Sequence, residues 1–166
     1  NTDNAMFARM LGPTMNYSCG YWKDAETLDE AQRNKMDLIC RKLDLKEGMS
    51  VLDIGCGWGG LSLYMAREYG VKVTGVTIST EQLAYAREHD AGHLVNWLLQ
   101  DYRSMEGQFD RIVSVGMFEH VVAELTIVMC FQSLILDMAG NVGTQSLAVT
   151  IRVLMDENLT AGQKVH

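Results

Sequence analysis

The sequence predicts an α/β protein built on a mostly parallel sheet with flanking helices. Short apolar stretches rich in β-branched residues alternate with amphipathic segments of helical length between residues 50 and 115. Because a helical crossover joins successive strands in parallel, this alternation favours a parallel sheet with right-handed connections. A glycine-rich stretch at residues 51–60 directly follows the first strand, and doubly wound sheets bind ligands at such turns. The sequence therefore predicts one domain with one ligand site at this turn.

The first part of the chain contains two expected helices. A short helix is expected at residues 5–11, before an irregular aromatic-rich segment at residues 17–22. The second begins at a capping box, in which Thr27 and Glu30 satisfy each other's backbone donors. The helical spacing of its apolar stripe predicts a core face rather than a binding site: Met36, Ile39, Cys40 and Leu43.

Four strands are expected from β-branched or aromatic runs, at residues 50–54, 71–76, 94–99 and 109–115. Two helices lie between the first three of these strands. The first runs from the glycines to Tyr69, with Gly70 as its stop. The second opens at another capping box, between Ser79 and Gln82, and runs to about Glu88. A long helical pattern then starts at Phe118, and residues 146–154 form a candidate fifth strand.

The composition suits a single globular domain. At 166 residues the chain can bury a substantial core, and its 48% hydrophobic content is ordinary. The formal net charge of −7 argues against nucleic-acid binding and would weakly repel an anionic membrane. The four cysteines show no paired spacing and no basic-then-apolar leader is present, which predicts reduced thiols in a cytoplasm. The longest apolar region, residues 121–136, is too short and too polar to span a bilayer.

The glycine turn favours a particular cofactor. Three glycines with the spacing G-x-G-x-x-G follow Asp53, and a helix then begins with unpaired N–H groups. A dinucleotide site would need an acid about 20 residues further on, but residues 75–79 contain none. The carboxylate of Asp53 suits instead the positively charged amino and sulfonium groups of S-adenosylmethionine. The alternative, that the glycines make only a tight strand–helix packing turn, stays open on these residues.

Five motifs resemble those of the cyclopropane-fatty-acyl-phospholipid synthase family, in the order and at the spacing of that family. They are YSCGYW at residues 17–22, VLDIGCGWGG at 51–60, GVTIS at 75–79, LQDYR at 99–103 and VGMFEHV at 115–121. The resemblance runs nearly continuously from about Asn4 to Val121, and several motifs distinguish the family from other class I methyltransferases. It implies a Rossmann-like class I methyltransferase fold and an enzyme that adds a methylene across a cis double bond of a phospholipid acyl chain.

The resemblance also implies which residues hold S-adenosylmethionine. The matching positions are Asp53, Gly55 and Gly57 for the methionine end; Thr77, Ser79 and Gln82 for the ribose; Gln100 and Asp101 for the adenine; and Tyr17 and Ser18 for closure over the bound cofactor. These assignments rest on the family pattern, residue by residue.

The base of the reaction comes from the same resemblance. In the family a bicarbonate ion acts as the base, and Cys19 and Glu119 match two of the groups that hold it. An alkene that attacks a sulfonium methyl leaves a carbocation, so the reaction needs a dry, oriented site and a base for one methyl proton. By itself Glu119 would be interpreted as a solvated acid at a helix N-terminus, whereas the resemblance favours a role in the site.

The resemblance stops after Val121. Residues 1–121 are therefore expected to form the cofactor-binding methyltransferase core, with a sheet that is incomplete at the C-terminus. Residues 122–166 are expected to form a tail with a helix and a candidate strand. A shifted reading frame and genuine divergence are alternative explanations of this tail, in which the family's further bicarbonate-holding His and Tyr residues have no match. Two other functions stay open: a non-catalytic S-adenosylmethionine-binding fragment, and a class I methyltransferase of a small soluble substrate.

The implied partner is an unsaturated phospholipid at a membrane surface, with no nucleic acid. This places the protein in the cytoplasm, with a position peripheral to the inner membrane as an option, and homo-oligomer formation stays open. His89 and His93 superficially resemble a helical zinc motif. Gly92 and the expected helix end spoil its i, i+4 geometry, and no third ligand is evident, so no metal is expected.

Overall fold

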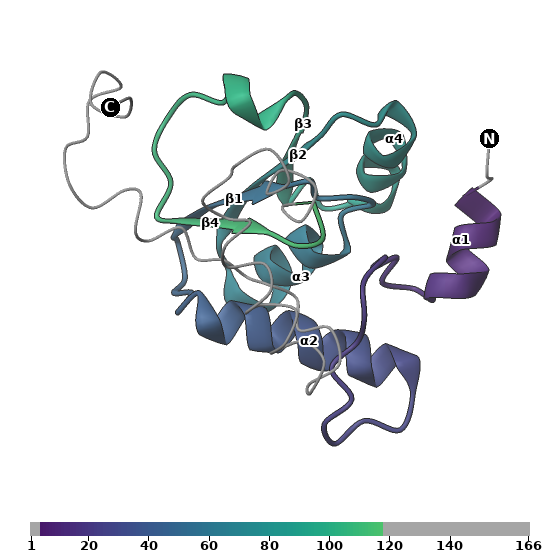
Figure 1. Cartoon of the computed structure of the whole chain (residues 1–166). Coiled ribbons are helices and arrows are strands. Elements are labelled where there is room, and N and C mark those ends of the chain that lie inside the picture. The colour runs from purple at the N-terminus through teal and green to yellow at the C-terminus, as the bar shows by residue number, and fades with distance from the viewer. Residues whose placement is uncertain (1–3, 118–166) are drawn as a thin grey trace, which may run out of the picture.

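The computed structural model of the chain describes residues 4–117, and these residues contain one four-stranded sheet. Its strands are β1 (Ser50–Ile54), β2 (Lys72–Thr77), β3 (Val95–Leu99) and β4 (Arg111–Ser114). All three strand pairs are parallel, and the spatial order is β3-β2-β1-β4 (Figure 1). The predicted parallel α/β sheet is confirmed. The strand order reverses at β1, because β2 and β3 extend the sheet on one side of β1 and β4 on the other.

The helices of the described region are α1 (Asn4–Leu11), α2 (Leu28–Lys42), α3 (Gly60–Tyr69) and α4 (Thr80–His89), with a short 3-10 helix, η1, at Tyr102–Ser104. The crossovers β1-α3-β2 and β2-α4-β3 advance in the same direction along the sheet. Right-handed crossovers in the same direction place both helices on the same face of the sheet. α2 packs beside α3 (Figure 1).

One of the two predicted capping boxes is confirmed. At the start of α2, Thr27 Oγ1 accepts a hydrogen bond from the backbone N–H of Glu30, and Glu30 Oε2 accepts one from the backbone N–H of Thr27. At the start of α4 the prediction was wrong in one half. Ser79 Oγ accepts from the backbone N–H of Gln82, but the N–H of Ser79 donates to Thr77 Oγ1. Thr77, at the end of β2, therefore accepts the hydrogen bond from the N–H of Ser79 that the side chain of Gln82 would accept in a capping box.

The element boundaries follow local hydrogen bonds and backbone angles. Strand β4 begins later than the predicted residue 109, because the carboxylate of Asp110 is bonded to Ser50. Asp110 Oδ2 accepts from the backbone N–H of Ser50 at 2.7 Å and from the hydroxyl of Ser50 at 2.8 Å. Gly70 ends α3 with a φ of 62°, as predicted from its position after Tyr69.

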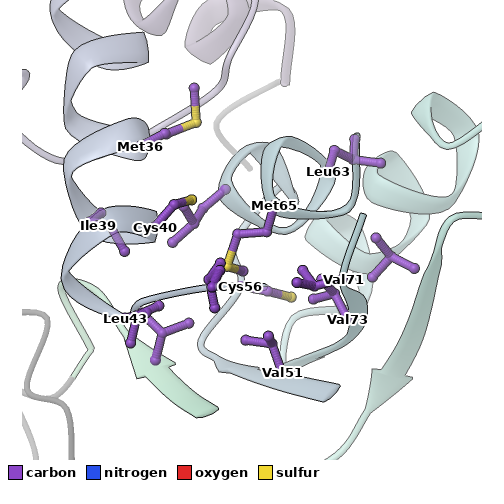
Figure 2. Close-up of a cluster of buried hydrophobic side chains, with 14 of the residues drawn as sticks. Met36, Ile39, Cys40, Leu43, Val51, Cys56, Leu63, Met65, Val71 and Val73 are labelled. Atoms are coloured by element: carbon purple, nitrogen blue, oxygen red, sulfur yellow. The ribbon is translucent and has the colours of Figure 1, made fainter. Parts of the chain in front are cut away.

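The core lies between the sheet and the three helices α2, α3 and α4. The predicted core stripe of α2 is confirmed, since its members are at most 3% exposed: Met36, Ile39, Cys40 and Leu43. Figure 2 shows Cys40 of α2 directed toward Met65 of α3, with Val51 of β1 beneath them. This packing fixes α2 against the sheet, so polar side chains on its neighbouring face are held in place as well.

Residues 12–22, here called the strap, follow α1 in the connection to α2 and lie against α3. The approach to α3 is close: a Cβ added to Gly60 would overlap the carbonyl oxygen of Thr14. The strap is also fastened to α2, because the N–H of Tyr21 donates to the carbonyl of Ala31 at 2.8 Å. Gly60, the third glycine of the G-x-G-x-x-G turn, is thus needed because a larger residue would prevent the strap from packing against α3.

Several predictions fall outside the described residues, namely the helical pattern from Phe118 and the candidate strand at residues 146–154. Within residues 4–117 no helix is long and apolar enough to cross a bilayer. The cysteines that this part of the structure describes, Cys19, Cys40 and Cys56, are free thiols.

Candidate cofactor-binding site

A cavity of about 800 Å³ lies at the carboxyl ends of β1, β2 and β4. Ligands of doubly wound sheets bind outside the carboxyl ends of the strands, where the strand order reverses, and this cavity has that position. Residues predicted to bind the cofactor make up much of its wall: Tyr17, Ser18, Asp53, Gly55, Gly57, Thr77, Gln82, Gln100 and Asp101. The structure thus brings together nine positions that are spread over 85 residues of sequence, Tyr17 to Asp101 counted inclusively.

Asp53 supplies the buried negative charge of this cavity. Its side chain is 2% exposed, and Oδ2 accepts a hydrogen bond from Ser62 Oγ of α3 at 2.6 Å. Burial raises the pKa of Asp53 to about 6, and the bond from Ser62 acts in the opposite direction. A buried carboxylate of this kind is stabilised in its charged form by a cationic ligand group.

The glycine turn provides bare backbone beside this carboxylate. Gly57 has a φ of 57°, and nothing lies within 4 Å of the Cβ that a side chain would add. Gly55 has a φ of 74°, and its added Cβ would lie 2.9 Å from Cβ of Met117, in the segment after β4. These positive φ values favour glycine, and the open space at Gly57 allows a ligand to approach the chain closely.

The residues predicted to hold a ribose form a small network at the end of β2. Thr77 Oγ1 donates to Gln82 Oε1 at 3.2 Å, and both side chains border the cavity. Ser79 does not line the cavity in this structure, because its hydroxyl caps α4 instead. Ile78, which lies between Thr77 and Ser79 in the sequence, is 80% exposed and borders the cavity with an apolar side chain.

The residues predicted to hold an adenine lie after β3. Gln100 Nε2 donates to the carbonyl of Ser104 at 2.8 Å, and Asp101 accepts from the guanidinium of Arg103 at 2.6 Å. The hydrogen bonds from Arg103 lower the pKa of Asp101 to about 2. Both residues therefore border the cavity with their side chains already oriented by neighbours.

The strap forms another part of the cavity wall. Tyr17, Ser18 and Cys19 line it, and the ring of Tyr17 packs edge-on against Phe7 of α1 with centroids 5.8 Å apart. Cys19 is exposed. Glu119, the other residue predicted to hold the base, lies outside the described residues.

Sequence reasoning missed Lys35, which also lines the cavity. α2 was interpreted as a core helix only, yet Lys35 lies beside its apolar stripe and is 3% exposed. One signal was available: Gln32 and Lys35 are three residues apart, so they share a helix face one turn above Ile39.

The solved structures that are similar to the chain include two with bound SAH. A mycolic acid cyclopropane synthase complexed with SAH and CTAB is 39% identical, with a TM-score of 0.67 over 71% of this chain and 43% of that chain. Coclaurine N-methyltransferase bound to N-methylheliamine and SAH is 37% identical, with a TM-score of 0.66 over 72% of this chain and 37% of that chain. With the strand order and the cavity at its reversal, these matches define the fold as that of a class I methyltransferase.

The chain belongs to the mycolic acid cyclopropane synthetase family, whose model matches residues 1–160. Cyclopropane-fatty-acyl-phospholipid synthase of Escherichia coli (strain K12) is 64% identical over 118 residues, which are 71% of this chain and 31% of that protein. Cyclopropane mycolic acid synthase 2 of Mycobacterium leprae is 42% identical over 125 residues, which are 70% of this chain and 41% of that protein. The chain thus spans about a third of the length of the Escherichia coli relative it matches.

Proposed function

We propose that the chain is the cofactor-binding part of an S-adenosylmethionine-dependent methyltransferase that converts a cis double bond of a phospholipid acyl chain to a cyclopropane ring. The observation that carries this proposal is the 64% identity to the Escherichia coli cyclopropane-fatty-acyl-phospholipid synthase. The family model, over residues 1–160, includes every residue that lines the cavity. In this proposal residues 1–121 form the methyltransferase core, and residues 122–166 form a separate tail.

The described residues fit the proposed cofactor. A cavity of about 800 Å³ has room for S-adenosylmethionine, and ligand sites commonly have volumes of this order. Asp53 offers a carboxylate to the cationic methionine end, and Gly57 offers uncovered backbone. The cofactor, when bound, supplies an electrophilic methyl group on its sulfonium. The residues of the chain orient that group and exclude water from it.

Thr77, Ser79 and Gln82 are proposed at the ribose, and Gln100 with Asp101 at the adenine. For Ser79 we propose an indirect role, because its hydroxyl fixes the start of α4 and so the position of Gln82. Tyr17 and Ser18 of the strap are proposed to close over the bound cofactor, consistent with their place in the cavity wall.

Ring closure requires a base that removes one proton from the transferred methyl group. We propose bicarbonate in this role, held in part by Cys19 and Glu119, as the family resemblance implies. The exposed position of Cys19 in the cavity wall supports this assignment for one of the two residues. No side chain needs to act as a strong nucleophile, since the alkene itself attacks.

The proposed substrate is an unsaturated phospholipid at a membrane surface, which places the protein in the cytoplasm at the inner membrane. The net charge of −7 does not attract anionic lipid, so apolar contacts would have to supply the affinity. Exposed apolar side chains occur on α1 and the strap, at Met6, Met10, Tyr17 and Trp22.

A second candidate is methyl transfer to a small soluble amine. It is favoured by the 37% identity to coclaurine N-methyltransferase, at a TM-score close to that of the cyclopropane synthase. The 64% identity to a phospholipid-modifying relative makes it the weaker candidate.

Transfer of isotope-labelled methyl from S-adenosylmethionine to vesicles separates these functions. We expect label in phospholipids with a cis-monounsaturated acyl chain, a mass increase of one CH₂, and no label in matched saturated vesicles. Label in an added amine but not in lipid would favour the second candidate. Cofactor binding without transfer to either acceptor would make the chain a non-catalytic binder.

A further inference from the structure

Lys35 is a buried cation in the wall of the proposed cofactor cavity. Its side chain projects from α2 and is 3% exposed, although lysine is almost never fully buried without a partner. Nζ donates to Ser18 Oγ at 2.7 Å, and the carbonyl oxygen of Ser18 lies 3.5 Å from Nζ. These contacts leave hydrogen-bonding capacity on the ammonium, which has three donors.

No carboxylate within residues 4–117 forms a salt bridge with Lys35, since the ion pairs of this region involve other lysine and arginine side chains. A buried ammonium without a counterion is costly, and an anionic ligand removes that cost. The chain as a whole is acidic, with a net charge of −7, so a buried cation in this cavity is not explained by an excess of basic residues.

The ammonium form of Lys35 persists at neutral pH. Burial lowers the pKa of Lys35 to about 8, and the nearby Cys19 acts in the opposite direction. At neutral pH most of the protein therefore carries a positive charge at this place in the cavity.

The position of Lys35 within the cavity indicates which part of the cofactor it meets. The proposed adenine and ribose residues follow β3 and β2, so the methionine end would lie toward β1 and β4. The end of α2 is joined to that half of the sheet, because Arg111 Nε of β4 donates to the carbonyl oxygen of Leu43 at 2.5 Å. Ile39 of α2 lines the cavity. Asp53 lies at the end of β1 in the same wall.

We propose that Lys35, together with the Ser18 hydroxyl that it holds, binds the carboxylate of the methionine part of S-adenosylmethionine. The two charges of the amino-acid end would then meet opposite charges of the protein: the ammonium near Asp53 and the carboxylate near Lys35. This inference rests on the proposed function and adds a positioning and cofactor-recognition residue to it. It also explains why the strap is bonded to α2, because the ammonium of Lys35 holds Ser18 at the cavity.

The test compares S-adenosylmethionine with its decarboxylated form, two ligands that differ only in the carboxylate. For wild-type protein we expect calorimetry to give roughly 10- to 100-fold tighter binding of S-adenosylmethionine, the range of a hydrogen bond to a charged group. In Lys35→Met, which keeps a long unbranched side chain, this preference is expected to shrink to within about threefold. Affinity for the decarboxylated ligand should change little.

Gln32→Met is the matched control, because Gln32 Nε2 also holds the strap by donating to the carbonyl of Ser18 at 2.8 Å, but Gln32 does not line the cavity. It should affect both ligands alike and keep their ratio. Because the ratio is measured within each variant, partial loss of stability does not imitate the result.

Two outcomes would overturn the inference: Lys35→Met binds both ligands with wild-type affinity, or it loses affinity for both ligands by the same factor. In either case the preference for the carboxylate-bearing ligand does not depend on Lys35. Failure of wild-type protein to bind either ligand would refute the proposed function itself, and so is distinguishable from these two.

Discussion

Replacing Asp53 by asparagine is expected to weaken the binding of S-adenosylmethionine by on the order of 100-fold at neutral pH, which corresponds to roughly 3 kcal/mol. The carboxylate is 2% exposed, so its attraction for a cationic ligand group is screened little by water. Asparagine has nearly the same size and can still accept the hydrogen bond from Ser62, so the packing around it is preserved. The loss of affinity would therefore result from the missing charge of Asp53 and not from a change in the shape of the site.

The same substitution is expected to stabilise the protein without ligand. Burial raises the pKa of Asp53 to about 6, above the value near 4 in an unfolded chain. The folded state therefore holds the proton more tightly, and the free energy of unfolding falls as the pH rises from about 4 to 6. Above pH 6 the ionised carboxylate costs the ligand-free fold about 3 kcal/mol. Asp53→Asn removes this cost and the pH dependence that goes with it.

Calorimetric titrations between pH 5 and pH 8 check the effect on affinity, and denaturant unfolding of the ligand-free proteins over the same pH range checks the effect on stability. For wild-type protein the affinity should fall as the pH drops below about 6, because the proton competes with the cationic ligand. Glu88→Gln, which neutralises an exposed carboxylate of α4, serves as the control. Equal affinities of wild-type protein and Asp53→Asn would contradict the role of this charge.

Gly60→Ala is expected to displace the strap from α3. The added Cβ would overlap the carbonyl oxygen of Thr14, and Asn16 Oδ1 would lie 3.2 Å away. A backbone group cannot move aside without moving the segment, so we expect a loss of about 2 kcal/mol in the free energy of unfolding. Because Tyr17 and Ser18 line the cavity, cofactor affinity should fall at least about tenfold as well.

Gly92→Ala is the matched control for this substitution. Gly92 lies far along the chain from the strap, has no positive φ, and its added Cβ would meet only the side chain of Leu94 at 3.2 Å. Unfolding curves and titrations of both variants check the expectation. A Gly60→Ala protein with wild-type stability and affinity would show that the strap is not seated on α3 in solution.

The architecture was largely predictable because it depends on local patterns. The β-branched runs placed four strands, and the capping box at Thr27 and the glycine at position 70 placed helix ends that the structure confirms. The second capping box was wrong because the competing acceptor, Thr77, lies in the preceding strand. A pattern confined to four residues does not contain that competitor.

The site was predictable where a motif carries it and unpredictable where packing creates it. Asp53 and the glycine turn stand together in sequence, so their place in the cavity followed from the motif. Lys35 faces the same cavity from a helix whose apolar stripe indicated only a core. Its position depends on how α2 packs against α3 and the sheet, which the spacing of its own residues does not specify.

We infer above all that this chain forms a selective S-adenosylmethionine site at the carboxyl edge of its sheet. Calorimetric titration of the chain with S-adenosylmethionine, and separately with a nicotinamide dinucleotide, tests it most directly. We expect saturable binding of S-adenosylmethionine only, since the end of β2 lacks the acid that a dinucleotide ribose requires. Absence of S-adenosylmethionine binding at millimolar ligand, or equal binding of the dinucleotide, would show that the cavity is not a selective S-adenosylmethionine site.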